Sequence, residues 1–178
     1  MNPLVDEYRT GYLARTLLLL HGPARRRTLC SMMYLADADY HELYEVGISW
    51  TPCIMTEDGP EHLGFDDVIS IRQLGIRRDG DTLRTDSGSY SPSILIGRNG
   101  DTMWADRRFL NPEAFNDREM QVIVRVADLA KELGEDGFTD FVMGDTPIRI
   151  AETGERIDLD AVFYRDGDRS VREYDEDR

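Results

Sequence analysis

Residues 116–134 read NDREMQVIVRVADLAKELG, the strongest helical pattern in the chain. Asn116 followed by Glu119 has the spacing of a capping box, which starts a helix. Apolar side chains then form two stripes: Met120, Ile123, Val124, Ala127 and Ala130 in one, and Val122, Val126, Leu129 and Leu133 in the other. A helix that is apolar over so much of its circumference is predicted to lie at the centre of the fold. Gly134 is predicted to end it.

Two earlier helices are predicted at residues 4–20 and 24–45. Gly22 and Pro23 separate them, because proline suits the first turn of a helix. Apolar residues recur at helical spacing in both segments. The stripe on the second helix is rich in methionine and tyrosine, for which packing in a core is the ordinary role.

The segment between the second helix and the helix that starts at Asn116 is predicted to hold a third helix and two β-hairpins. Residues 47–52 look extended or turning, and a helix is expected from Glu61 to Leu74, ending at Gly75. The hairpins are expected at 76–84 and 93–104. Their turn pairs, Asp79-Gly80 and Asn99-Gly100, tolerate the positive φ that such turns need.

Short helices are expected at 139–143 and from 146 to 153, and residues 157–164 alternate apolar with polar side chains. The predicted fold is α+β and mainly α-helical, a helical core with a small inserted antiparallel β-hairpin sheet. One domain is expected over residues 1–165. Residues 166–178 are almost all charged and are expected to form a mobile tail.

The charge balance is strongly acidic. The 178 residues carry 35 Asp and Glu against 21 Lys and Arg, a net charge of −14, and Lys131 is the single lysine. An acidic surface rich in aspartate is typical of halophilic proteins, because concentrated salt screens its self-repulsion; a mesophile whose codon bias replaces lysine with arginine is the alternative. This balance disfavours non-specific binding to nucleic acid or to anionic membranes.

The cysteines and the hydropathy indicate a cytoplasmic protein. Cys30 and Cys53 lack the CxxC spacing of a redox or zinc motif, and we expect free thiols in a reducing compartment. The longest apolar run, Leu17 to Leu20, is far too short to span a membrane. The N-terminus does not have the pattern of a secretory signal.

No motif of an enzyme is present in the sequence. It contains neither a phosphate-binding glycine loop, nor a nucleophile elbow, nor a zinc-ligand pattern, so we expect no catalytic activity, no metal and no cofactor. One pair stays open: Asp37 and His41 are four residues apart on the second helix and would share a face. Such a pair can bind a metal or exchange protons, although a simple hydrogen bond or ion pair is the ordinary explanation.

Arginines support a second interpretation. Arg72, Arg77 and Arg78 lie near the third helix and the first hairpin, and 25–27 are three consecutive arginines. A helix followed by a hairpin is similar to a winged-helix module, in which both elements contact DNA. Pairing of these arginines with neighbouring carboxylates is the simpler explanation.

The run Met33-Tyr34-Leu35-Ala36-Asp37, followed by Tyr40-His41, resembles the Panacea family of antitoxin SocA-like domains. Further pieces are similar in the same order over residues 10–165. These pieces are Gly47-Ile48, Gly59-Pro60, Leu74-Gly75-Ile76, Asp117-Arg118-Glu119, Thr146-Pro147 and Gly154-Glu155-Arg156-Ile157-Asp158. The segment from Ser49 to Glu57 departs from the family pattern, and Gly144-Asp145 stands where a histidine is common.

The resemblance implies a non-enzymatic module that binds and neutralises a partner toxin, either directly or as a proteolytic adaptor. The expected partner is a protein, such as a toxin encoded nearby, and the expected binding residues are Tyr34, Asp37, Tyr40 and His41. Packing and loop-holding hydrogen bonds are the structural alternative for these four residues. A winged-helix-like transcriptional regulator that uses Arg72, Arg77 and Arg78 is the alternative function.

Overall fold

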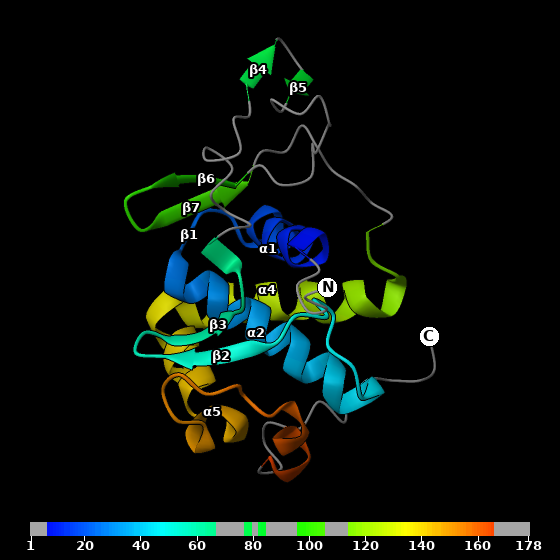
Figure 1. Ribbon diagram of the computed structural model, residues 1–178, viewed down its shortest axis with the longest axis vertical. Coiled ribbons are helices and arrows are strands. Elements are labelled where there is room, and N and C mark those ends of the chain that lie inside the picture. The colour runs from blue at the N-terminus through cyan, green and yellow to red at the C-terminus, as the bar shows by residue number, and fades with distance from the viewer. Residues whose placement is uncertain (1–6, 67–76, 80–81, 85–95, 106–113, 166–178) are drawn as a thin grey trace.

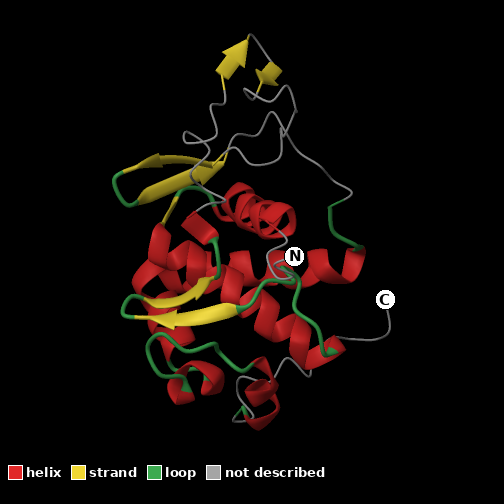
Figure 2. Ribbon diagram, in the orientation of Figure 1, coloured by secondary structure: helices red, strands yellow, loops and turns green. Residues whose placement is uncertain are grey.

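The computed structural model describes residues 7–66, 77–79, 82–84, 96–105 and 114–165. Three long helices form its core: α1 (Glu7–His21), α2 (Arg26–Tyr44) and α4 (Asp117–Met143). Two short helices, α5 (Thr146–Ile150) and the 3₁₀ helix η4 (Leu159–Tyr164), follow α4. Small antiparallel sheets lie beside α1 and α2, and a further strand pair lies beyond them (Figures 1 and 2). The predicted class, α+β and mainly helical, is confirmed.

The most enclosed helix is α2, whereas the sequence favoured α4. Every residue from Thr28 to Tyr40 is buried. The reason is that α1, α4, strand β3 (Gly59–His62) and η4 all pack against α2. By contrast, Val124 and Leu133 of α4 are exposed, so the apolar character of α4 extends beyond the face it buries.

The predicted capping box starts α4. Oδ1 of Asn116 accepts a hydrogen bond from the Glu119 N–H at 3.0 Å, and Glu119 Oε2 accepts one from the Asn116 N–H at 2.9 Å. The predicted break at Gly134 is also present, because its φ of +70° and ψ of 166° interrupt the helical backbone. A second helical piece follows to Met143 and begins earlier than the predicted residue 139.

Replacing Asn116 by alanine is expected to lower the free energy of unfolding by about 1 kcal/mol, because the first turn of α4 loses an acceptor for an unpaired N–H. Urea denaturation measures the change. The control is Gln121→Ala, an exposed position of the same helix without a capping role, and it should change stability by no more than about 0.5 kcal/mol. Equal effects of the two substitutions would contradict the capping role.

In the part of the chain that the structure describes, three small antiparallel sheets replace the single expected one. Strands β1 (Ala24–Arg25), β7 (Thr102–Ala105) and β6 (Ile96–Asn99) form one sheet in the order β1-β7-β6. Strands β4 (Arg77–Asp79) and β5 (Thr82–Arg84) pair with each other. Both predicted hairpins are therefore confirmed over the described residues. Both predicted turn pairs are wrong by one position, because Asp79 pairs with Thr82 and Asn99 pairs with Thr102 as strand residues. In the second hairpin the two-residue turn is therefore Gly100-Asp101.

The third sheet was not predicted. Strand β2 (Cys53–Thr56) pairs with β3, so the expected helix from Glu61 is wrong at its first four residues: Glu61 and His62 belong to β3, and residues 63–64 form a turn. A proline within a strand argues against a sheet, yet Pro60 pairs with Met55 in this short hairpin. Residues 67–74 of that expected helix lie outside the described residues, as does the tail 166–178.

The last part of the chain folds back along β2. The N–H of Met55 donates to the Glu155 carbonyl at 2.8 Å, and the N–H of Ile157 donates to the Cys53 carbonyl at 2.8 Å. The alternation noted at 157–164 belongs to this connection and to η4, whose first turn is capped by the Asp158 side chain. These contacts bring residues 154–160 beside the loop that follows α2. Among the described residues, no helix is long and apolar enough to cross a membrane.

Candidate functional site

The four residues predicted for binding lie on α2, and the structure separates their roles. Tyr34 is fully buried, and its hydroxyl donates to Asp145 Oδ2 at 2.8 Å. Burial, together with the neighbouring Asp145, raises the pKa of the Tyr34 phenol well above its usual value. Tyr40 is also buried and packs on the Tyr44 ring. These two side chains belong to the core.

Asp37 organises the loop that follows α2. Its carboxylate is buried, and Oδ1 accepts the Ser49 N–H at 2.7 Å. Oδ2 accepts the Ser49 hydroxyl and the His62 Nε2–H, the latter at 2.7 Å. The loop also approaches closely at Gly47, where an added Cβ would lie 3.2 Å from Asp37 Cγ. Three hydrogen bonds to one carboxylate therefore hold the loop and β3 against α2.

The same network continues through the next residues of the loop. The Thr51 N–H donates to Ser49 Oγ at 3.1 Å, and the Thr51 hydroxyl lies 2.7 Å from that of Thr10 on α1. Ser49 and Thr51 are thus both buried and are fixed in place by hydrogen bonds. Trp50 between them takes a φ of +59° and is 59% exposed.

Trp50 is held in a strained and displayed position. A bulky residue in the left-handed region costs about 1–3 kcal/mol and persists only where its surroundings impose it. Arg9 supports the ring, since its guanidinium lies 4.3 Å from the Trp50 ring centre and also pairs with Glu119. The Arg9 Nε–H donates to the Ile48 carbonyl at 2.5 Å. Arg9 therefore joins α1, the loop and the start of α4.

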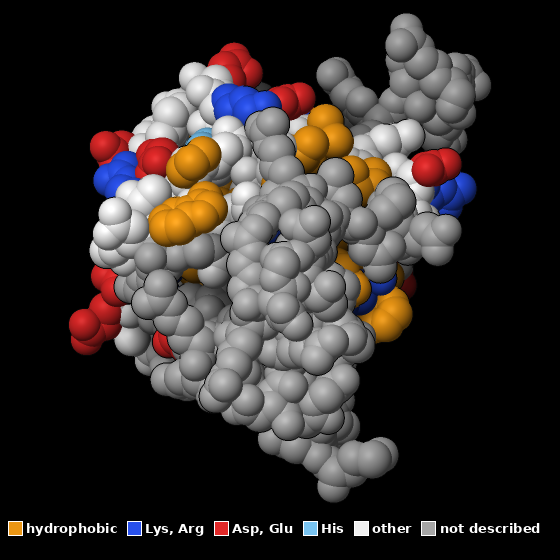
Figure 3. All heavy atoms as spheres, turned by 90° about the horizontal axis from the view of Figure 1, so that it is seen from above, with side chains coloured by type: hydrophobic (Ala, Val, Ile, Leu, Met, Phe, Trp, Pro, Cys, Tyr) orange, Lys and Arg blue, Asp and Glu red, His pale blue; other side chains and the backbone are white. Residues whose placement is uncertain are grey.

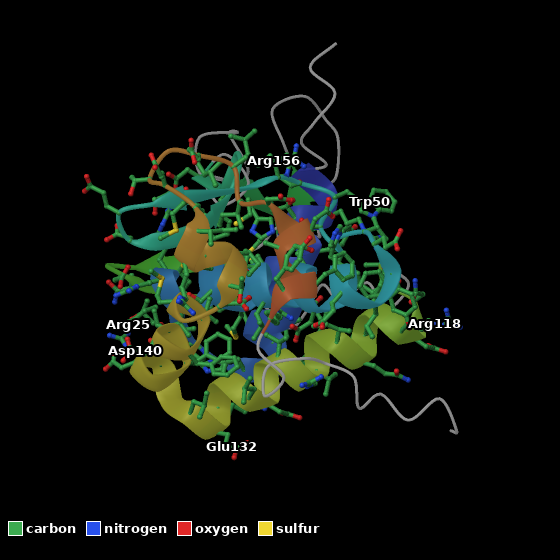
Figure 4. All side chains as sticks on the ribbon, turned by 90° about the horizontal axis from the view of Figure 1, so that it is seen from below. Arg25, Trp50, Arg118, Glu132, Asp140 and Arg156 are labelled. Carbon is green, nitrogen blue, oxygen red and sulfur yellow. The ribbon has the colours of Figure 1, made fainter. Side chains whose placement is uncertain are left out.

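A cleft of about 730 Å³ lies beside this loop. One wall comes from the end of α2 and the loop, including His41, Val46 and Trp50, and the other comes from residues 156–160. Figure 4 shows Arg156 and Trp50 on the same side of the molecule, Arg156 from the segment before η4 and Trp50 from the loop after α2. Asp37 also lines the cleft, so two of the four predicted residues meet there.

Asp37 and His41 do not pair with each other. His41 Nε2 lies 2.7 Å from Asp160 Oδ1, whereas Asp37 binds His62. The expected contact between Asp37 and His41 is therefore absent, and each of the two side chains contacts a residue of another element instead. Among the described residues, no group of three or more histidine, cysteine or acidic side chains is placed to hold a metal ion. Cys53 lines the cleft, but burial raises the pKa of its thiol, which weakens it as a nucleophile.

A second buried cluster, which the sequence did not indicate, surrounds Arg165. Its side chain is 1% exposed, and Nη1 donates to Asp39 Oδ1 at 2.8 Å and to Glu42 Oε2 at 2.9 Å. Nε and Nη2 bind the two oxygens of Asp145 at 2.9 and 2.8 Å. Asp145 also accepts the Tyr34 hydroxyl. One guanidinium thus joins α2, the start of α5 and the end of η4.

Asp39 gives this cluster a pH dependence. Burial raises the pKa of its carboxyl from 3.8 to about 6, although the Arg165 and Arg125 guanidinium groups oppose the rise and Asp145 adds to it. A group whose pKa is higher in the folded state favours folding most when both states are protonated. Its contribution is therefore full below about pH 4 and is lost as the pH rises through about 6.

Asp39→Asn should remove this loss. The free energy of unfolding of the variant minus that of the parent chain is expected to increase by up to about 3 kcal/mol between about pH 4 and pH 8. Urea denaturation across this range measures the difference. Asp128→Asn, an exposed carboxylate beside Lys131, is the control and should give a nearly flat difference. A flat difference for Asp39→Asn would contradict the prediction.

The arginines of the DNA-binding interpretation are only partly described. Arg72 lies outside the described residues, and Arg77 and Arg78 lie on β4, where the backbone alone is described. Arg25 contacts two acidic side chains of α4, and Arg26 contacts Glu61 and Asp66. Acidic side chains occupy several separate places on the face seen from above, with arginine or lysine beside some of them (Figure 3). Arg25 and Arg26 thus form the intramolecular pairs that were the simpler explanation.

The sequence did not single out Trp50, Ser49, His62 or Arg165. Trp50 stands in a loop bounded by Gly47 and Pro52, and an aromatic residue in such a loop was the available indication. Comparison of the chain with protein-family models, curated proteins and solved structures finds no match. The function of the cleft therefore has to be inferred from the residues that build it.

Proposed function

We propose that the chain is a non-enzymatic protein-binding module of the antitoxin or proteolytic-adaptor type, and that it binds its partner toxin at the cleft beside Trp50. The resemblance of residues 33–41 to the Panacea family supplies the class of function. Two of the residues in that run, Asp37 and His41, line the cleft. The proposal therefore joins the family resemblance to a particular surface.

The displayed Trp50 carries the proposal. Tryptophan is among the residues that contribute most binding energy at protein interfaces, particularly at the centre of a contact. Here a buried network holds the Trp50 backbone at a positive φ and leaves the residue largely exposed. Backbone strain that the surrounding structure maintains is typical of binding sites. Val46 is also exposed and lines the cleft, which adds apolar contact area.

We further propose that the module works in a cytoplasm with concentrated salt. The buried free thiols Cys30 and Cys53 suit a reducing compartment. Because the net charge is −14, raising KCl from about 0.1 M to about 2 M should screen self-repulsion and raise the melting temperature by about 5 °C or more. Differential scanning fluorimetry measures the shift. An unchanged or lower melting temperature in concentrated salt would contradict a halophilic protein.

The binding proposal is tested by capture from source cells at their native salt concentration. Tagged parent chain, Trp50→Ala and Trp104→Ala are compared, and retained proteins are identified by mass spectrometry. Trp104 is the matched control because it is also exposed and stands on β7, at the end of the molecule away from η4 (Figure 1). A DNA-shift assay on the same preparations covers the regulator alternative.

The expected result is one stoichiometric protein, retained by the parent chain and by Trp104→Ala. The affinity of Trp50→Ala for the purified partner should be at least about tenfold weaker. Co-expression of the parent chain should also relieve the toxicity of that partner. The proposal would be overturned if all three chains retained the same proteins equally, or if DNA alone were retained.

A further inference from the structure

We infer that the occupant of the cleft is an extended basic segment of the partner, with an arginine side chain seated against Trp50 and the carboxylates of the opposite wall. This inference rests on the proposed function and specifies its partner. It depends on three properties of the cleft: the charge of its rim, the surroundings of the Trp50 ring, and the apolar surface between them.

The rim is acidic. Glu45, Asp158 and Asp160 line the cleft and are exposed, against Arg156 as the arginine of the lining. Asp160 pairs with His41 and is the more exposed of the two, with 76% of its side chain exposed. Carboxylates grouped on two sides of a cleft attract a cation and repel a phosphate backbone. The charge therefore favours a basic peptide over a nucleic acid as the occupant.

Trp50 already binds one guanidinium. Arg9 lies over the ring at 4.3 Å, which shows that this indole accepts a planar cation at stacking distance. Because Trp50 is a largely exposed residue, its ring is accessible to a second cation from a partner. Arginine suits such a place better than lysine, because its planar group can stack on an aromatic ring and pair with a carboxylate at once.

Apolar surface continues from the ring into the cleft. Val46, Pro52, Ile157 and Leu159 also line it. Long basic side chains lay their methylene stems along apolar surface while the charged end stays in contact with polar groups. A cleft with an apolar interior and an acidic rim therefore matches arginine over its whole length.

Fluorescence anisotropy with three labelled peptides tests this inference. The probe is a short peptide in which arginine alternates with glycine. In the two comparison peptides every arginine is replaced, either by lysine or by citrulline, the neutral isostere. The chain is used in full, as parent, Trp50→Ala and Asp160→Asn. The matched controls are Trp104→Ala and Asp140→Asn, an exposed aspartate of α4.

The parent chain is expected to bind the arginine peptide about tenfold more tightly than the citrulline peptide, and more tightly than the lysine peptide. Trp50→Ala and Asp160→Asn should each weaken binding by about fivefold or more, and the two controls should leave it unchanged. Equal binding to all variants would show general attraction to an acidic protein and would overturn the inference. So would the absence of binding to the arginine peptide.

The two proposals can fail separately. If a partner protein is captured through Trp50 but the arginine peptide does not bind, the module stands and the basic segment is wrong. If the captured protein contacts the cleft through an acidic or apolar segment, as read from cross-links to residues 45–53, the basic segment is likewise wrong. Self-association of the purified chain that is lost in Trp50→Ala would place a second copy in the cleft and overturn the inference.

Discussion

Asp37→Ala is expected to lower the free energy of unfolding by about 3–5 kcal/mol, because it removes the acceptor of three buried hydrogen bonds. The Ser49 N–H, the Ser49 hydroxyl and the His62 Nε2–H would all lose their partner. Water cannot easily replace the carboxylate, since His62 is itself buried. Urea denaturation measures the loss of stability.

The chain contains a matched control for this substitution. Asp160 also pairs with a histidine at 2.7 Å, but its side chain is largely exposed, and Asp160→Ala should cost no more than about 1 kcal/mol. Asp37→Asn should fall between the two, because the amide oxygen still accepts hydrogen bonds. Equal costs for Asp37→Ala and Asp160→Ala would contradict the role of the buried network.

The same substitution should release Trp50. In a Trp104→Phe background, Trp50 is the remaining tryptophan. Adding Asp37→Ala is expected to increase quenching of its fluorescence by acrylamide, because Ser49 would no longer fix the loop. The measurement is made in conditions where far-ultraviolet circular dichroism shows that the chain is folded. Unchanged quenching in the folded variant would show that the network does not hold Trp50.

Arg165→Met is expected to lower the free energy of unfolding by about 3–5 kcal/mol at neutral pH, because three carboxylates lose the cation that compensates their burial. Asp39, Glu42 and Asp145 all contact this guanidinium within 2.9 Å. Methionine preserves much of the apolar volume of the side chain. The defect should therefore come mainly from uncompensated negative charge.

Acid should partly reverse this defect. Without Arg165, protonation of the buried carboxylates relieves their mutual repulsion, so the loss of stability should shrink as the pH falls from about 8 to about 5. Arg25→Met is the matched control, since Arg25 also contacts two carboxylates but is exposed. Its effect on stability should be much smaller than that of Arg165→Met across the same pH range, because solvent screens its exposed ion pairs. A cost for Arg165→Met that is small, or constant with pH, would contradict the cluster.

Local patterns predicted much of the fold. The capping box at Asn116 and the break at Gly134 are properties of a few neighbouring residues, and both are present. The turn-forming residues between apolar stretches predicted both hairpins, although each turn lies one position later than expected. Strand β1 could not be predicted in this way, because its two residues pair with β7, about eighty positions later. The hairpin β2–β3 was not predicted, because the dipeptide Gly59-Pro60 is typical of a turn or loop rather than of a strand.

The candidate site was predicted only in part, for a similar reason. Asp37 and His41 were selected as a pair because four residues on a helix share a face. Each binds a residue from another element instead, and those partners depend on how β3 and η4 pack against α2. Trp50 is displayed because of tertiary contacts from Arg9 and Thr10. Neither contact can be inferred from the sequence of the loop alone.

Amide hydrogen exchange of the complex, made with the partner captured at native salt, is the most direct measurement of where this chain binds. The free and bound chains are compared at equal pH and salt. Binding at the cleft predicts slower exchange in residues 45–53 and 154–160, with residues 96–105 unchanged. Slower exchange in 96–105, with 45–53 unchanged, would show that the partner binds elsewhere and that Trp50 is not its anchor.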